Sequence, residues 1–385
     1  MPQLKVGFLS FHNYLDKTSF SGIPYYMHRA LSDRDIELIN LGFPYSPEAL
    51  HRKIKHKFKN AISKLQASTM SIFTDSTRFK NLDTKVEQQL KNNPCHAIVA
   101  PVASSELNFL ETNIPIIYIS DATPYLIHKY YKIPETQEEF NIYEQRELVA
   151  IIKSKLLIYS SQWAANSALE HYNAKAEQIK IIPFGANLDS APDVAELHKR
   201  CQNMSPVRLL FVGVNWQRKG GMIAYETLLS LLDRGIDAEL TIVGCKPPDG
   251  IHHERLNVIP FINKNVPQEY DRFNRLFLDS HFFVLPTRAD CSPIVIGEAS
   301  AFGLPAVTSD VGGLPALIEE DKNGCILPFS ATGKDYADAI ANQISSPQKY
   351  AQLVTTARQE YETRLNWDSW AEKVHSAILE VVNSK

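Results

Sequence analysis

The chain has 385 residues, of which 44% are hydrophobic and 22% charged, and its formal net charge at pH 7 is −3. This length exceeds a single ordinary core and favours two domains, with three as the alternative. A charge this close to neutrality argues against a general nucleic-acid binder, and no apolar run approaches the length of about 18 residues that a membrane-spanning helix needs. The N-terminus lacks a signal-peptide pattern, and the five cysteines form no CxxC pair or metal-ligand spacing, so we expect a reduced, cytoplasmic protein.

Short apolar strands alternate with amphipathic helices in the first half of the chain. The strands are predicted at 5–10, 36–42, 97–101, 115–120, 155–160 and 178–184. The helices are predicted at 22–31, 46–66, 78–92, 135–153 and 162–172. The polar, irregular stretch 186–206 that follows indicates a linker between two domains.

The second half repeats this alternation. Its strands are predicted at 208–213, 238–244, 257–261, 281–286, 305–310 and 325–329, and only helices are predicted from Gly333 onward. Continuous apolar strands separated by helices indicate parallel sheets covered on both faces. We therefore expect an α/β protein with two doubly wound, Rossmann-like domains, 1–186 and 205–364, that face a central cleft. Ligands of such sheets bind at the carboxyl ends of the strands.

The most informative segment is TRADCSPIVIGEASAFGLPAVTSDVGG, at 287–313. It predicts a loop, a short helix with Ser292 as N-cap and Pro293 at its first position, and a strand. Glu298 is the only charged residue of this apolar helix, and Asp290 lies eight residues before it. A buried carboxylate is costly unless something hydrogen-bonds it, and a sugar diol is one group that can do so. A helix carboxylate satisfied by nearby backbone is the structural alternative.

A second informative segment is FVGVNWQRKGG, at 211–221. It predicts a strand that ends at Gly213 and a helix that opens near Gly220, which would place Arg218 and Lys219 at a helix N-terminus. Peptide dipoles and two cations would act there on an anion, and the glycines would let backbone approach a phosphate. Fixed cations of this kind stabilise negative charge that develops on a bound anion without a metal. A solvated basic pair is the alternative.

Together with IPFGANLD at 182–189, these segments resemble the family 4 glycosyltransferases. Members of that family are retaining, nucleotide-sugar-dependent enzymes of the two-domain GT-B fold. The match covers most of residues 205–330 and is specific in order and spacing, whereas the first half matches in layout. The resemblance implies that the C-terminal domain binds the nucleotide-sugar donor and the N-terminal domain binds the acceptor.

The resemblance also implies roles for individual residues of the donor domain. Glu298 would bind the ribose hydroxyls, Lys219 the diphosphate, and Asp290 the transferred sugar. The segment that follows Asp290 would face the donor, in part through backbone N–H groups: Cys291, Ser292, Pro293, Ile294 and Val295. A loop after the strand at 257–261, with Ile262 and Lys264, would lie under the nucleobase, and the loop 244–249 is a second candidate for that wall.

Four positions depart from the family pattern. Asp290 is one methylene shorter than the acidic residue usual there, and Cys291 and Ser292 replace a glycine and an aromatic residue. The arginine that commonly follows the strand-end glycine is replaced by Val214. Arg218 is the candidate to supply the missing charge.

The acceptor side is less sharply indicated. By resemblance, the N–H groups around Gly22 lie near the donor phosphates or the acceptor. Tyr14, Asp16 and Thr18, in the long loop before it, either face the cleft or belong to a solvated surface loop.

Asp121 follows the carboxyl end of the fourth strand, where doubly wound sheets place functional groups. It is the preferred candidate to act on an acceptor hydroxyl or to bind sugar hydroxyls. His128 is a further candidate, with aromatic packing as its alternative.

Three remaining patterns concern metals, membranes and the C-terminus. The DxD sequence at 33–35 falls between a helix and a strand, so we interpret it as a solvated turn and expect no metal. The segment 51–65 predicts a basic amphipathic helix. We interpret it as a helix that packs on the core with its charged face in solvent, and peripheral contact with the inner face of a membrane is the alternative. The final helix, at 365–385, is expected to cross back to the N-terminal domain, with a cap on its own domain as the alternative.

The sequence thus predicts a metal-independent retaining glycosyltransferase that moves a sugar from a nucleotide-sugar donor to a sugar or lipid-linked acceptor. No cofactor is expected, and no side chain is identifiable as a nucleophile. Three alternatives stay open: a nucleotide-sugar epimerase or a phosphorylase on the same fold, and a non-catalytic nucleotide-sugar-binding protein with a decayed site. The donor base, sugar, acceptor and linkage are not predicted.

Overall fold

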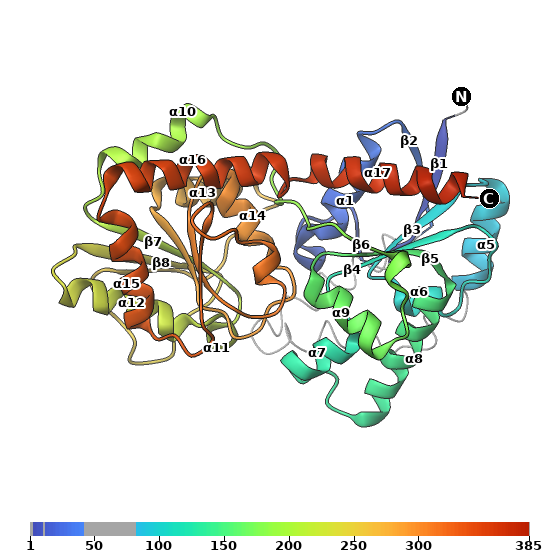
Figure 1. Cartoon of the computed structure of the whole chain (residues 1–385), viewed down its shortest axis with the longest axis horizontal. Coiled ribbons are helices and arrows are strands. Elements are labelled where there is room, and N and C mark those ends of the chain that lie inside the picture. The colour runs from blue at the N-terminus through green and yellow to red at the C-terminus, as the bar shows by residue number, and fades with distance from the viewer. Residues whose placement is uncertain (1–2, 11, 42–81, 385) are drawn as a thin grey trace. The chain divides into compact units, whose positions relative to one another are not determined.

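The computed structural model describes residues 3–10, 12–41 and 82–384, which form two compact units. The first unit comprises Met1–Leu15, Pro24–Ile182 and Ala371–Lys385, and the second comprises Asp16–Ile23 and Pro183–Trp370. Each unit is built on one parallel sheet of six strands (Figure 1). The predicted α/β class with two doubly wound, Rossmann-like sheets is confirmed.

The sheet of the first unit has the order β2-β1-β3-β4-β5-β6. Its strands are β1 Leu4–Phe8, β2 Ile36–Asn40, β3 Ala97–Pro101, β4 Ile116–Ser120, β5 Ser154–Tyr159 and β6 Ile179–Ile181. Its helices are α1 Ile23–Ser32, α5 Leu82–Asn92, α6 Ser104–Leu107, α7 Pro124–Tyr131, α8 Gln137–Lys153 and α9 Gln162–His171. One apolar core joins this sheet to α5, α6, α8 and α9. The alternation of strands and helices predicted from the sequence produces this arrangement.

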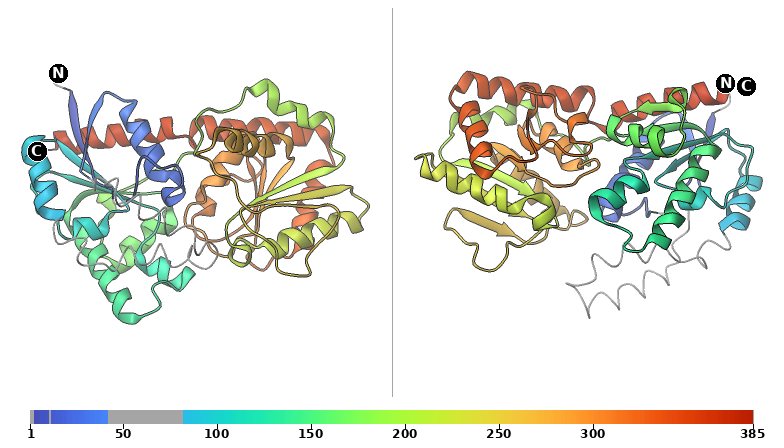
Figure 2. Two further views of the ribbon diagram at one scale, coloured as in Figure 1. Left: turned by 180° about the vertical axis from the view of Figure 1, so that it is seen from behind. Right: turned by 60° about the horizontal axis from the view of Figure 1, so that its bottom comes forward.

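The sheet of the second unit has the order β12-β11-β10-β7-β8-β9, and its strands fan out in the left view of Figure 2. They are β7 Val207–Val212, β8 Ala238–Val243, β9 Leu256–Ile259, β10 Phe282–Leu285, β11 Ala306–Ser309 and β12 Gly324–Leu327. The helices are α11 Trp216–Lys219, α12 Gly221–Asp233, α13 Pro267–Asp279, α14 Ile294–Ala301, α15 Gly333–Ile344 and α16 Pro347–Thr363.

Two apolar layers cover the faces of this second sheet. Helices α12 and α15 pack together on one face, and α13 and α14 supply the core of the other. Because both faces are covered, the strands can be apolar along their whole length.

All twelve predicted strands are present, each within two or three residues of its predicted ends. The helix at 124–131 was not predicted. The linker was expected to be irregular, but part of it is helical. It contains α10 Val194–Leu197, which Asp193 caps by accepting from the N–H of Ala195, and the 3-10 turn His198–Gln202. Arg200 of that turn is buried and donates to the carbonyls of Ser280 and Phe302, which anchors the linker to the second unit.

The last helix, α17 Trp367–Asn383, contributes to both units. Trp367 belongs to the second unit, where its indole donates to Asn187 Oδ1 at 2.8 Å. Glu380 belongs to the first unit, where it pairs with Lys180 of β6. None of the helices in the described ranges combines the length and apolarity needed to cross a bilayer. The predicted helices 46–66 and 51–65 lie outside the described residues, as do the first residues of 78–92.

Gly220 separates α11 from α12 and adopts the left-handed region, with φ +77°. A Cβ at this position would lie 1.9 Å from the carbonyl oxygen of Pro286, so the chain cannot accept a side chain here without moving backbone. Gly235 has nearly the same φ, +75°, yet a Cβ there would meet nothing within 4 Å. The two glycines therefore separate the cost of the left-handed conformation from the cost of the steric clash.

We expect Gly220→Ala to lower the free energy of unfolding by about 3 kcal/mol or more, because strain and overlap act together. Gly235→Ala, which carries only the conformational cost, should lower it by about 1 kcal/mol. Urea unfolding of both variants checks this. Equal losses in the two variants would contradict the steric account.

A buried carboxyl group lies in the core of the first unit. Glu147 of α8 is 1% exposed, and its Oε2 accepts a hydrogen bond from the Tyr118 hydroxyl at 2.9 Å. Burial raises the pKa of Glu147 from 4.5 to about 7, against the opposing effect of hydrogen bonds from Tyr118 and Ser104. Since the pKa is higher in the folded state, the stabilisation is complete below pH 4.5 and is lost as the pH rises through 7.

We expect Glu147→Gln to remove this pH dependence. Relative to the wild type, the free energy of unfolding of the variant should increase by about 3 kcal/mol between pH 4.5 and pH 8. Urea unfolding at a series of pH values measures the difference. Glu138→Gln, on the exposed side of the same helix, is the control and should follow the wild type. If the free energies of unfolding of Glu147→Gln and wild type differed by the same amount at every pH, the raised pKa of Glu147 would be contradicted.

Candidate functional site

The short helix α11 sets the position of two cations at the end of β7. Its N-cap is Asn215, whose side chain accepts a hydrogen bond from the N–H of Arg218 at 2.9 Å. Gly213 leaves room for the Lys219 side chain, because a Cβ there would lie 2.8 Å from Lys219 Cγ. The carbonyl of Arg218 accepts from the N–H of Arg288, which fixes α11 against the loop after β10.

Lys219 and Arg218 form an ionic cluster with Asp290. The Nζ of Lys219 lies 2.5 Å from Asp290 Oδ2, and Arg218 Nη1 lies 3.7 Å from Asp290 Oδ1. Lys219 and Asp290 are only 8% and 7% exposed. Burial lowers the pKa of Lys219, and the attraction of Asp290 opposes that shift. Two cations and one anion leave the cluster with a formal charge of +1, so it can attract a further anion.

Asp290 is held by the glycines that follow β11. A Cβ at Gly312 would lie 1.9 Å from the carbonyl oxygen of Asp290, and that oxygen accepts a hydrogen bond from the N–H of Gly313. Arg218 Nη1 also donates to the carbonyl of Ala289 at 2.7 Å. The loop that carries Asp290 therefore rests on backbone contacts from two other segments.

Helix α14 carries Glu298, which is 1% exposed. Its Oε1 lies 2.6 Å from the Nζ of Lys264, in the loop between β9 and α13. Its Oε2 is buried and has no hydrogen-bond partner among the described residues. The alternative of a carboxylate satisfied by local backbone is therefore not what the structure shows, because its partner is a lysine 34 residues away. Neither this pairing nor that of Lys219 with Asp290 was predicted from the sequence.

Two local predictions are corrected. The helix predicted to open near Gly220 is present as α12, which begins at Gly221, but the residues before it are not a loop, because Arg218 and Lys219 form the last turn of α11. The cause is the left-handed Gly220, which ends one helix before the next begins. Helix α14 begins at Ile294 with Pro293 as its N-cap, so Ser292 lies outside it. The extended conformation of Pro293, with ψ 104°, shifts the start by one residue.

The other predicted donor-site residues are close in sequence to members of the two ion pairs, Lys219 with Asp290 and Lys264 with Glu298. Cys291 is buried between Asp290 and α14, while Ile294 and Val295 form the first turn of α14 and are half-buried. Ile262 is half-buried in the loop that carries Lys264. No disulfide involves any of the five cysteines, all of which lie in the described ranges.

Part of the first loop belongs to the second unit. Gly22 is buried there with φ +84°, and Asn187 Nδ2 donates to the neighbouring carbonyl of Ser21 at 2.6 Å. Asp16 accepts from the N–H and hydroxyl of Thr18, at 2.9 and 2.7 Å. These hydrogen bonds, all to other residues of the protein, account for the conformation of this loop.

The remaining candidates lie in the first unit. The Tyr14 ring stacks on His28, with centroids 4.6 Å apart. His128 packs on Phe140 at 4.4 Å and contacts the carbonyl of Pro134 through Nδ1, as the packing alternative anticipated. Asp121 is half-buried directly after β4. Asp33 and Asp35 are exposed between α1 and β2.

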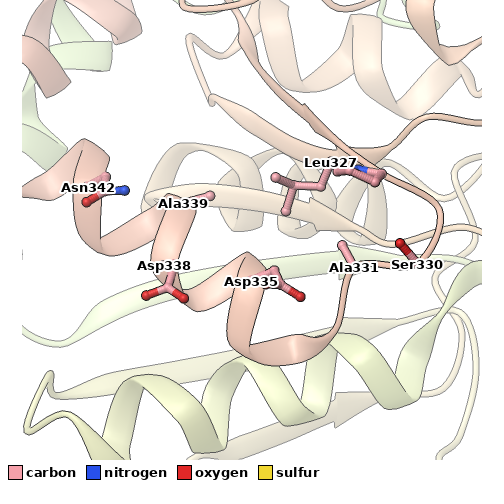
Figure 3. A pocket seen from close by; sticks show the side chains of 8 residues that line it. Leu327, Ser330, Ala331, Asp335, Asp338, Ala339 and Asn342 are labelled. Carbon is pink, nitrogen blue, oxygen red and sulfur yellow. The ribbon is translucent and has the colours of Figure 1, made fainter.

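A separate hollow of about 410 Å³ lies between the end of β12 and α15 (Figure 3). Its two acidic residues already have partners: Asp335 accepts from Thr332, and Asp338 pairs with Arg234. The hollow contains none of the predicted site residues. The ionic groups around α14 therefore remain the better candidate for chemistry.

Comparison with known proteins supports a common family for the second unit. Residues 206–346 match the family model of the group 1 glycosyl transferases. D-inositol 3-phosphate glycosyltransferase of Corynebacterium diphtheriae is 23% identical over 288 residues, which are 69% of this chain and 65% of that protein. The match thus spans less than two thirds of the relative.

Solved structures share the fold of the whole chain. Sucrose-phosphate synthase from Thermosynechococcus elongatus has a TM-score of 0.68 and 14% identity, over 99% of this chain and 100% of that one. Anabaena Alr3699/HepE in complex with UDP-glucose has a TM-score of 0.63 and 16% identity, over 98% and 100%. At these identities the likeness shows the fold, and the predicted GT-B architecture is confirmed.

We expect Asp290→Asn to lower the free energy of unfolding by about 3 kcal/mol, because it leaves the buried Lys219 without its counter-ion. The loss should be smaller in the double variant Lys219→Met/Asp290→Asn, in which no buried charge is stranded. Glu319→Gln, which breaks an exposed pair with Lys322, is the control and should cost less than about 1 kcal/mol. Urea unfolding measures all three, and a loss in the double variant as large as that of Asp290→Asn alone would contradict this account.

Proposed function

We propose that this chain, which has the GT-B fold and whose residues 206–346 match the group 1 glycosyl transferases, transfers a sugar from a nucleoside-diphosphate sugar to an acceptor hydroxyl. The observation that carries the proposal is a pair of lysine–carboxylate contacts whose carboxylates, Asp290 before α14 and Glu298 within it, are both buried. One, Lys219 with Asp290, has a second cation beside it, and the other, Lys264 with Glu298, leaves a carboxylate oxygen unpartnered. An anion and a hydroxyl-bearing sugar are the ligands that these groups fit.

The donor binds with its diphosphate at Lys219 and Arg218 and its ribose at Glu298. When the bond from the sugar C1 to the diphosphate oxygen breaks, negative charge develops on that oxygen. Cations already fixed in place stabilise this charge without reorganising during the reaction. Lys219 is well suited to this role, since it is buried beside Gly213, where a side chain would collide with it, and is paired with Asp290.

The bond from C1 to the acceptor oxygen forms on the face from which the diphosphate leaves, so the anomeric configuration is retained. The acceptor proton passes to the departing phosphate, which balances the reaction without a protein nucleophile. Asp290 binds the hydroxyls of the transferred sugar. Asp121 contacts the acceptor, which is a sugar or a lipid-linked sugar, and the reaction uses no metal. UDP and UDP-glucose, which Anabaena Alr3699/HepE is seen to bind, are the first donor candidates.

A panel of UDP-, GDP-, ADP- and dTDP-sugars tests the proposal by thermal shift and by product formation, with and without EDTA. We expect one donor class to stabilise the protein and to turn over equally in EDTA. Lys219→Ala should weaken binding of that donor by about tenfold or more, since each hydrogen bond to a charged group contributes about 1.5–3 kcal/mol. Glu298→Ala should weaken it similarly.

Lys322→Ala, which removes an exposed lysine of the same unit, is the matched control and should bind the donor as the wild type does. Unchanged donor affinity in Lys219→Ala and Glu298→Ala would overturn the site. Loss of turnover in EDTA would overturn metal independence. Inverted anomeric configuration in the product, measured by NMR coupling constants, would overturn retention, and a product epimerised on the nucleotide would replace transfer by epimerisation.

A further inference from the structure

We propose that Lys264 is a positioning residue that aims the Glu298 carboxylate at the ribose of the donor. This inference rests on the proposed function, and it gives Lys264 a different role from contact with the nucleobase. It begins with the burial of Glu298, whose carboxylate is 1% exposed and has one charged partner within the described ranges. A buried carboxylate needs such a partner, because water no longer solvates it.

The backbone holds Lys264 in place before any ligand binds. Its loop is a tight turn in which the N–H of Val266 donates to the carbonyl of Asn263 at 3.0 Å. The Asn263 side chain accepts from the N–H of Asn265, and Glu269 of α13 accepts from the N–H of Asn263 at 2.6 Å. The residues on both sides of Lys264 are therefore fixed by hydrogen bonds within the turn and to the next helix.

The side chain of Lys264 is directed as well. Its Nζ lies 4.3 Å from the centroid of the Phe273 ring, which is buried in α13, and 2.6 Å from Glu298 Oε1. The ring face attracts the ammonium group and limits the directions it can take. Because the ammonium group is turned to a carboxylate and a ring, its main contact is with Glu298.

This arrangement leaves one oxygen of Glu298 available. With Oε1 fixed by Lys264, the orientation of the carboxyl plane is set, and Oε2 stays buried without a partner in the described part of the chain. An ionised carboxylate only accepts hydrogen bonds, so the missing partner is a donor. A ribose hydroxyl supplies an O–H, whereas a phosphate oxygen does not. Lys264 thus acts on the ligand through Glu298.

Titration calorimetry with UDP, GDP and ADP and with their 2′-deoxy and 3′-deoxy forms tests this role. We expect the wild type to bind its preferred ribonucleoside diphosphate about tenfold or more tightly than at least one deoxy form, as a charge-assisted hydrogen bond implies. Lys264→Met should weaken the ribo form to the level of that deoxy form and leave the deoxy form unchanged. Lys264→Arg should restore much of the preference. Lys322→Met is the matched control and should behave as the wild type.

A double-mutant cycle separates positioning from direct contact. Lys264→Met should weaken binding no further in a Glu298→Gln background. If Lys264→Met unfolds, Lys264→Gln takes its place, and melting curves establish which variants are folded. A loss shared equally by ribo and deoxy forms, or one that adds fully to that of Glu298→Gln, would overturn the inference and leave the proposed function standing. Failure of every nucleoside diphosphate to bind the wild type would overturn the proposed function, and this inference with it.

Discussion

The buried ion pair between Lys219 and Asp290 is the contact on which the arrangement of the second unit's site depends. It joins the segments that follow β7 and β10, which are neighbours in the sheet. Burying two charges is costly, and the cost is recovered only when the geometry is held closely. Three glycines supply that geometry: Gly213 beneath the lysine stem, Gly220 against Pro286, and Gly312 against the carbonyl of Asp290. Small residues at these positions are therefore a condition for the ion pair.

The second ion pair, Lys264 with Glu298, also holds a buried carboxylate beside a lysine, but it differs from the first in net charge. Lys219 shares Asp290 with Arg218, so the first cluster keeps an excess of positive charge. Lys264 and Glu298 neutralise each other, and what remains is a hydrogen-bond acceptor without a net charge. One group therefore attracts anions over a distance, and the other selects by hydrogen bonding at close range. A nucleoside diphosphate presents an anion and a diol, which are the two chemistries that these groups complement.

The sequence predicted the sheets well because each strand is a continuous apolar run bounded by polar turns, as AIVAP at 97–101 illustrates. The ends of helices were harder to predict. Serine is a favourable N-cap residue, so Ser292 was predicted to cap α14, whereas the extended Pro293 is the N-cap. The four residues of α11 are too few to show a helical period, so the sequence did not reveal that Arg218 and Lys219 belong to a short helix of their own before α12. Residue types at the site were predictable, but their pairing was not. Lys264 and Glu298 are 34 residues apart, and only the fold of β9, α13 and α14 brings them together.

Two residues at which this sequence departs from the pattern that it resembles, Val214 and Asp290, lie at or near the ion pair between Lys219 and Asp290. Val214 is 71% exposed and uncharged, at the position where the resemblance of the sequence implies an arginine. Arg218 comes from one turn further along the chain and reaches the same carboxylate that Lys219 contacts. Asp290, with its shorter stem, keeps its carboxylate at the buried Lys219 Nζ rather than extending past it. The cluster therefore keeps a net positive charge although position 214 carries none, because Arg218 and Lys219 together outweigh the single carboxylate of Asp290.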